Sequence, residues 1–112
     1  MKELSLKKLA AWCGGTIHPA DAEAAVTGTQ IDSRLVRRGD LFVAIAGERV
    51  DGHDYVSKAR EAGAAAALVS HLVDDPLPQI LVADTTLAYG DMAREYRTET
   101  GVDVVAITGS VG

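Results

Sequence analysis

The sequence predicts a layered α/β domain, in which a small mixed β-sheet is flanked by helices. Short apolar runs, too brief to be the helices of a bundle, alternate with segments whose apolar residues recur at helical spacing. Hydrophobic residues make up 47% of the 112 residues and aromatic residues only 4%. This composition favours aliphatic strands packed against Ala-rich helices, with enough apolar side chains for a buried core. The length is that of one ordinary domain.

Capping residues and glycines mark the expected helices. The helices run from the cap Ser5 to Gly14, from the cap Asp54 to Gly63, and from the cap Asp84 or Thr85 to Gly101. In the last of them, Ala88, Met92 and Tyr96 recur every four residues and predict one apolar face.

Five strands are expected, over residues 26–31, 41–45, 65–70, 79–83 and 104–107. The first alternates apolar and polar residues, as a half-buried strand does. The second is entirely apolar, which is typical of a central strand covered on both faces. Between them, the residues Arg37-Arg38-Gly39-Asp40 are typical of a turn. The first two strands could pair antiparallel, and the sheet is therefore expected to be mixed.

The net charge of −5 and the pI near 5.0 argue against a nucleic-acid partner, because binding to phosphate backbones needs a basic excess. The single cysteine, Cys13, excludes an internal disulfide and is expected to be a small core residue. No apolar stretch approaches the ~18 residues of a membrane span. A cytoplasmic protein with no membrane partner is expected.

Few residues suggest a metal site. The three histidines His18, His53 and His71 show no ligand spacing with one another or with Cys13, so no metal is expected. Asp32 precedes a turn, where a short acid commonly binds local backbone N–H groups, and is interpreted as structural.

The end of the chain resembles the start of a phosphate-binding loop. The strand at 104–107 leads directly into Thr108-Gly109-Ser110-Val111-Gly112. Glycines after a strand let backbone N–H groups surround phosphate oxygens, with a following lysine and hydroxyl to complete the site. The spacing of the glycines does not match the general phosphate-loop motif literally. The lysine that follows the last glycine in that motif is not among the 112 residues.

A second group of residues lies in the body of the chain. It comprises Ile31-Asp32-Ser33-Arg34, the segment Arg38 to Ile45, and the loop Gly47-Glu48-Arg49-Val50-Asp51-Gly52-His53 with Asp54-Tyr55 after it. Together with Ala-Ile-Thr-Gly-Ser-Val-Gly at the end, this group resembles the N-terminal part of the Mur ligase family. The match over about residues 29–69 is specific, because many positions agree at fixed spacing.

The resemblance implies a UDP-binding domain over residues 1–102. Residues 103–112 would then be the first strand and partial phosphate loop of a truncated ATP-binding central domain. It places UDP contacts at Ser33, Glu48, Arg49 and Val50, with Asp51 and Gly52 shaping the loop. From the residues themselves, the guanidinium of Arg34 could donate to the diphosphate. Equally, Arg34 could pair with Asp32 or Asp40.

The implied parent enzyme is an amide-forming ligase of peptidoglycan precursor synthesis. It would use ATP and Mg²⁺ to join D-Ala-D-Ala to UDP-N-acetylmuramoyl-tripeptide. Thr108, Gly109, Ser110, Val111 and Gly112 would form part of its ATP site. The segment 1–112 contains no catalytic residue and is expected to be inactive alone. Two alternatives remain: the related activity that adds diaminopimelate or lysine, and a nucleotide-sugar-binding or interaction module without catalysis.

Overall fold

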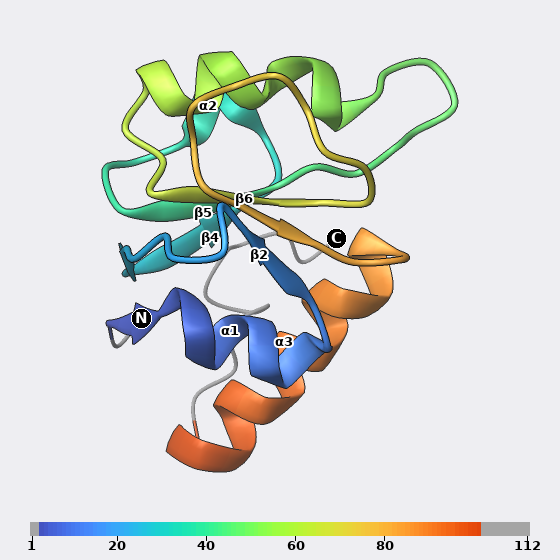
Figure 1. The fold of residues 1–112 in the computed structure, drawn as a ribbon. Helices are drawn as coiled ribbons and strands as arrows, with labels where there is room; N and C mark the ends of the chain where they lie inside the picture. Colours follow the sequence, from blue (N-terminus) through green and yellow to red (C-terminus); the bar gives the residue numbers. More distant parts are fainter. Residues whose placement is uncertain (1–2, 102–112) are drawn as a thin grey trace.

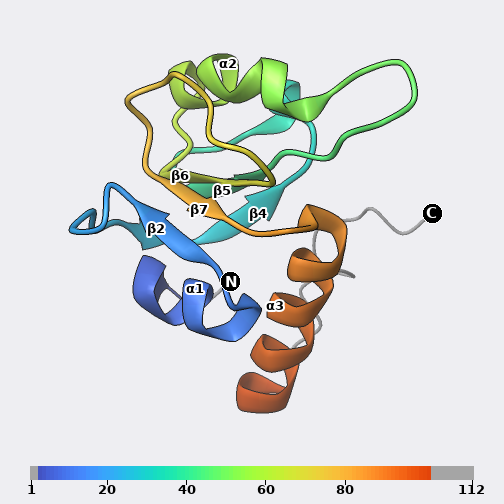
Figure 2. The ribbon, with the colours of Figure 1, turned by 45° about the vertical axis from the view of Figure 1, so that its right-hand side comes forward.

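The structure is a computed structural model that describes residues 3–101. Its main feature is a sheet of five strands in the order β2-β7-β6-β5-β4. The helix α2 (Val56–Glu61) covers one face of this sheet, and α1 (Leu6–Cys13) and α3 (Thr85–Thr100) cover the other (Figures 1 and 2). The α/β class with helices on both faces of the sheet is confirmed.

Four neighbouring strands of the sheet run parallel, and the edge strand β2 is antiparallel to β7. Their bounds are β2 Thr16–His18, β4 Gly28–Gln30, β5 Asp40–Val43, β6 Ala66–Val69 and β7 Gln79–Leu81. The remaining strands, β1 (Leu4–Ser5) and β3 (Ala25–Val26), form a separate antiparallel pair.

The sheet is mixed, but for a different reason from the one expected. The expected strand at 26–31 is divided into β3 and β4, which belong to different sheets. β4 pairs parallel with β5, so the antiparallel pairing that seemed possible from the sequence is not the one formed. The antiparallel member is β2, a short edge strand with an exposed or half-buried pattern that gave no hydrophobic signal. The strand expected at 104–107 lies outside the described residues.

Alternate residues of the central strands build two separate cores. Leu41 and Val43 of β5 face α1 and α3, whereas Phe42 and the following Ala44 face α2. All four are essentially inaccessible to solvent. Because both faces of β5 are covered, its sequence is apolar without interruption, as a parallel central strand requires.

The helices begin at the residues that can cap them, with one exception. The side chain of Ser5 accepts from the Lys8 N–H at 3.2 Å, and that of Asp84 accepts from the Leu87 N–H at 3.0 Å. The expected cap Asp54 is wrong. That residue is exposed within a 3₁₀ helix, η2 (Gly52–Tyr55), which precedes α2 and is capped by Asp51 instead.

The larger core lies between the sheet and the helices α1 and α3. Ala88, Met92 and Tyr96 are buried there, as their spacing predicts. Cys13 packs against this core, and burial raises the pKa of its thiol. Among the described residues, no helix is both long and apolar enough to cross a bilayer.

We predict that Asp84→Ala lowers the free energy of unfolding by about 1 kcal/mol, the usual cost of losing an N-cap side chain. The Leu87 N–H would lose its partner at the start of α3. Urea denaturation followed by circular dichroism measures the change. Glu95→Ala, at an exposed position within the same helix, is the matched control. Equal unfolding free energies for the two variants would contradict the capping role.

Candidate functional site

An open groove of about 590 Å³ lies at one edge of the sheet, beside the carboxyl ends of β4 and β5. Ligand sites of α/β sheets commonly form at this edge, because the loops that follow parallel strands converge there. The lining residues come from three segments of the chain and from β5. They are Ile31, Asp32, Ser33, Arg34, Phe42, Ile45, Val50, Gly52, Tyr55 and Lys58.

One wall of the groove is the turn after β4, which folds into a short 3₁₀ helix, η1 (Ser33–Leu35). Asp32 caps this helix by accepting from the Arg34 N–H at 2.9 Å. The guanidinium of Arg34 returns to the same carboxylate, with Nε donating to Oδ1 at 3.0 Å and Nη2 to Oδ2 at 2.7 Å. The structural interpretation of Asp32 is confirmed, and so is its pairing with Arg34.

This ion pair is exposed but geometrically well formed. The hydrogen bonds from the Arg34 side chain and backbone lower the pKa of Asp32 to about 2. Asp32 therefore stays ionised at neutral pH and cancels the charge of Arg34. Ser33, between them, is half-buried, and its hydroxyl makes no hydrogen bond to any residue of the described range 3–101.

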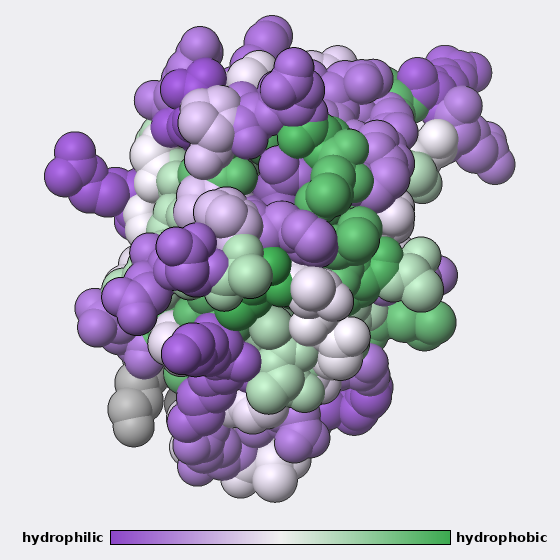
Figure 3. Space-filling model, in the orientation of Figure 1, coloured by the Kyte–Doolittle hydropathy of each residue, from purple (hydrophilic) through white to green (hydrophobic). Residues whose placement is uncertain are grey.

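The opposite wall is the loop between β5 and η2, which protrudes at the upper right of Figure 1 and is largely hydrophilic there in Figure 3. The Gly47 N–H donates to the Val50 carbonyl at 2.8 Å, which closes a tight turn. The Gly52 N–H donates to the Ile45 carbonyl at 2.9 Å. A Cβ on Gly52 would lie 2.7 Å from the Ile45 nitrogen, so only glycine fits against this strand end.

The loop is fixed to the sheet through His53, which is 5% exposed. Its Nε2 accepts from the Ser70 N–H at 2.9 Å, at the end of β6. A backbone N–H can only donate, so Nε2 carries the lone pair and the ring proton is on Nδ1. Nδ1 then donates to Asp51 Oδ1 at 2.6 Å, and the His53 N–H donates to the same oxygen at 3.0 Å. These bonds lower the pKa of Asp51.

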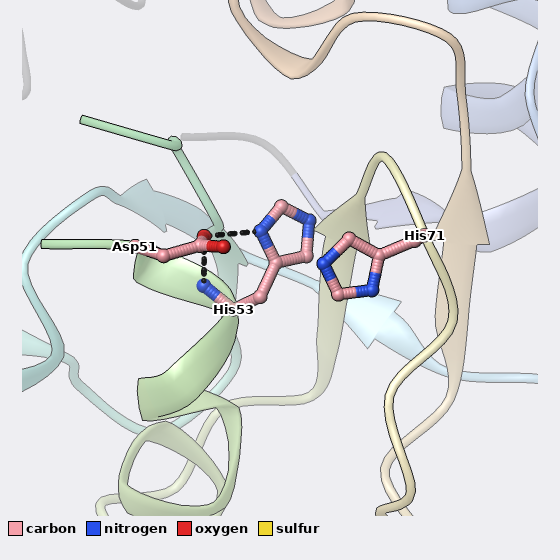
Figure 4. A group of neighbouring side chains, drawn as sticks. All are labelled: Asp51, His53 and His71. Atoms are coloured by element: carbon pink, nitrogen blue, oxygen red, sulfur yellow. Dashed lines mark hydrogen bonds and ion pairs between the residues drawn. The ribbon is translucent and has the colours of Figure 1, made fainter. Parts of the chain in front are cut away.

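The imidazole of His71 stacks on that of His53, with ring centroids 4.1 Å apart and an angle of 18° between the planes (Figure 4). Ligand atoms of Asp51, His53 and His71 lie within 4.8 Å of one another, a cluster that sequence spacing did not reveal. The arrangement does not suit a metal ion, because both ring nitrogens of His53 already have partners. The lone pairs of two nearly parallel rings also cannot converge on one ion.

The structure brings together four of the seven residues expected to bind UDP. Ser33, Arg34, Val50 and Gly52 line the groove. The side chains of Glu48 and Arg49 are exposed on the protruding loop outside it, and Asp51 is directed to His53. The positions expected to bind ATP, Thr108, Gly109, Ser110, Val111 and Gly112, lie outside the described residues.

Tyr55 and Lys58 also line the groove, although the sequence did not lead us to expect either at the site. They are adjacent on one side of η2 and α2, where the Lys58 ammonium lies 5.7 Å from the centroid of the Tyr55 ring. Their three-residue spacing at the start of a helix was the available signal.

Comparison with known proteins places these features in a family. Residues 25–107 match the Mur ligase family, catalytic domain. Over all 112 residues, the chain is 41% identical to the UDP-N-acetylmuramoyl-tripeptide--D-alanyl-D-alanine ligase of Escherichia coli K12, of which it spans 24%. It is 36% identical to the ligase of the same name from Bacillus subtilis 168, again over its whole length and spanning 25% of that protein.

Solved structures agree with the sequence relatives. The fold superimposes on MurF from Acinetobacter baumannii with a TM-score of 0.82 and 28% identity, covering 90% of this chain and 22% of that one. It superimposes on MurF from Thermotoga maritima in complex with ADP with a TM-score of 0.60 and 32% identity, covering 66% and 17% respectively. The chain thus spans about a quarter or less of the proteins that it matches.

We predict that His53→Ala lowers the free energy of unfolding by roughly 2–4 kcal/mol, because it opens a cavity and leaves the Ser70 N–H unpaired. His71→Ala removes an exposed ring from the same stack and should cost less than about 1 kcal/mol. Chemical denaturation of the two variants measures the difference. Similar losses for both would show that the stack, and not the Ser70 bond, stabilises the loop.

We also predict that Arg34→Leu raises the pKa of Asp32 from about 2 towards its ordinary value of 3.8, since the Arg34 side chain is the main cause of the depression. The folded-state pKa is the lower one, so the pair stabilises the fold above about pH 4. That contribution is lost as the pH falls towards 2. Carboxyl-detected NMR titration measures the shift. Arg37→Leu, at an exposed neighbouring position, should leave it unchanged.

Proposed function

The chain belongs to the Mur ligase family, and we propose that its groove binds the UDP group of UDP-N-acetylmuramoyl-tripeptide. The observation that carries this proposal is the convergence of Ser33, Val50 and Gly52, from two separate segments, on the same groove. The family resemblance expects nucleotide contacts at Ser33 and Val50 and expects Gly52 to shape the loop. The relatives that match the whole chain are named as ligases acting on this substrate.

The chemistry of the groove suits a nucleoside diphosphate. Its floor and sides carry apolar surface from Phe42, Ile45 and Tyr55, against which a flat base can pack. The hydroxyl of Ser33, which has no partner among residues 3–101, can donate to or accept from a polar edge of the ligand. Gly52 allows the backbone to approach closely, and the neighbouring exposed loop with Glu48 and Arg49 can contact a larger ligand from above.

In this proposal, residues 1–102 bind the substrate, and residues 103–112 begin an ATP-binding domain. Phosphorylation of the peptide carboxylate by ATP with Mg²⁺, and the attack by D-Ala-D-Ala, would occur beyond the groove. Holding the UDP end still contributes to such a reaction, because remote binding energy positions the reacting end. The proposal places the reaction in the cytoplasm, within peptidoglycan precursor synthesis.

A second candidate differs only in the amino substrate. The chain is 39% identical, over 78% of its length, to a UDP-N-acetylmuramoyl-L-alanyl-D-glutamate--2,6-diaminopimelate ligase from Aquifex aeolicus. The matches to the D-alanyl-D-alanine ligases of Escherichia coli and Bacillus subtilis extend over the whole chain, which favours the first candidate. Assay of the complete ligase with D-Ala-D-Ala and with diaminopimelate distinguishes the two.

We predict that Ser33→Ala weakens the binding of UDP-N-acetylmuramoyl-tripeptide about fivefold, the usual worth of one neutral hydrogen bond. Isothermal titration calorimetry measures the affinity. Ser57→Ala, at an exposed position on α2 outside the groove, is the matched control and should bind as the unsubstituted chain does. If Ser33→Ala binds equally well, or the unsubstituted chain does not bind, the groove is not the UDP site.

A further inference from the structure

The charges that line the groove do not balance. Asp32 contributes one negative charge, and Arg34 and Lys58 contribute one positive charge each. Asp32 and Arg34 form a two-point ion pair, with N···O distances of 3.0 and 2.7 Å, and so cancel each other. The net positive charge of the groove is therefore that of Lys58.

Lys58 also has no ionic partner in the part of the chain that the structure describes. Among residues 3–101, no carboxylate lies within ion-pair distance of its ammonium, whereas Lys8, Arg34, Arg60 and Arg94 each have an acidic partner. Its ammonium lies over the ring of Tyr55, whose centroid is 5.7 Å from Nζ. A cation over an aromatic face is weakly attracted to it, so the ring keeps the ammonium at the groove without neutralising it.

We propose that Lys58 is the cation that binds the diphosphate of the nucleotide, with Tyr55 as its positioning residue. This inference rests on the proposed UDP-binding function and assigns the charge recognition to one residue. A diphosphate carries a negative charge that must be compensated when it leaves bulk water. In a chain whose net charge is −5, that compensation has to be local. Lys58 supplies it as a compact charge on a flexible stem.

Two other cations are less suited to this role. The guanidinium of Arg34 still has free N–H groups on Nη1 and can orient a phosphate by hydrogen bonding. Its positive charge, however, is neutralised by the carboxylate of Asp32. Arg49 is exposed on the protruding loop and does not line the groove. Removing the charge of Lys58, of Arg34 or of Arg49 should therefore affect the affinity for the diphosphate differently.

The test compares uridine, which lacks phosphate, with UDP, using calorimetry on the full chain. Lys58→Met should weaken UDP binding by about tenfold, the worth of one charge-assisted contact. Uridine binding should change by less than about twofold, because an uncharged ligand gains nothing from the ammonium. Lys58→Arg should restore most of the UDP affinity. Lys7→Met, which removes an exposed lysine from α1, is the charge-matched control.

Salt provides an independent readout. The UDP affinity of the unsubstituted chain should fall as ionic strength rises, and this dependence should be weaker in Lys58→Met. The inference is overturned if Lys58→Met binds UDP as the unsubstituted chain does, or loses affinity for UDP and uridine equally. It is also overturned if Lys7→Met has the same effect. If the unsubstituted chain binds neither ligand, the proposed function itself fails, which is a distinguishable result.

Discussion

The hydrogen bond from the Ser70 N–H to His53 Nε2 joins the two parts of the chain on which the groove depends. His53 follows the loop that forms one wall of the groove, and Ser70 follows the central strand β6. A neutral imidazole has one donor and one acceptor nitrogen. Here the Ser70 N–H of the sheet donates to Nε2, and Nδ1 donates to the carboxylate of Asp51. A loop with mostly exposed side chains has little apolar surface with which to fix itself. Its position therefore comes from this polar connection and from the close approach of Gly52 to the end of β5.

The groove also depends on the direction of β4. Since β4 and β5 are parallel, their carboxyl ends lie at the same edge of the sheet, and the turns that follow them face each other. With the antiparallel pairing that the sequence suggested, Ser33 and Gly52 would lie at opposite edges. A parallel pairing requires the chain to cross back between the two strands. The crossing segment carries η1, so the turn that makes the topology possible is also the turn that presents Asp32, Ser33 and Arg34.

Features determined by neighbours in sequence could be predicted, and features that depend on distant contacts could not. The caps Ser5 and Asp84 and the apolar β5 follow local rules, and the structure has all three. The edge strand β2 has no hydrophobic pattern, because an edge strand is stabilised by pairing with β7 and not by burial. His53 and His71 are separated along the chain by a helix and a strand, so no rule of sequence spacing could have indicated their contact. The only signal for Lys58, its three-residue spacing from Tyr55, does not distinguish an unpaired lysine from a paired one.

The polar groups around the groove divide into those that satisfy one another and those that do not. Asp32 with Arg34, and Asp51 with His53, are used internally, and they set the shape of the two walls. Ser33 and Lys58 have no such partner within the described residues, although they lie beside groups that do. A polar group left unpaired at a half-enclosed surface gains more from a ligand than one already paired, because no internal bond has to be broken. Within the described residues, the internal pairs that fix the walls therefore leave the Ser33 hydroxyl, the Lys58 ammonium and the remaining N–H groups of Arg34 for the proposed nucleotide.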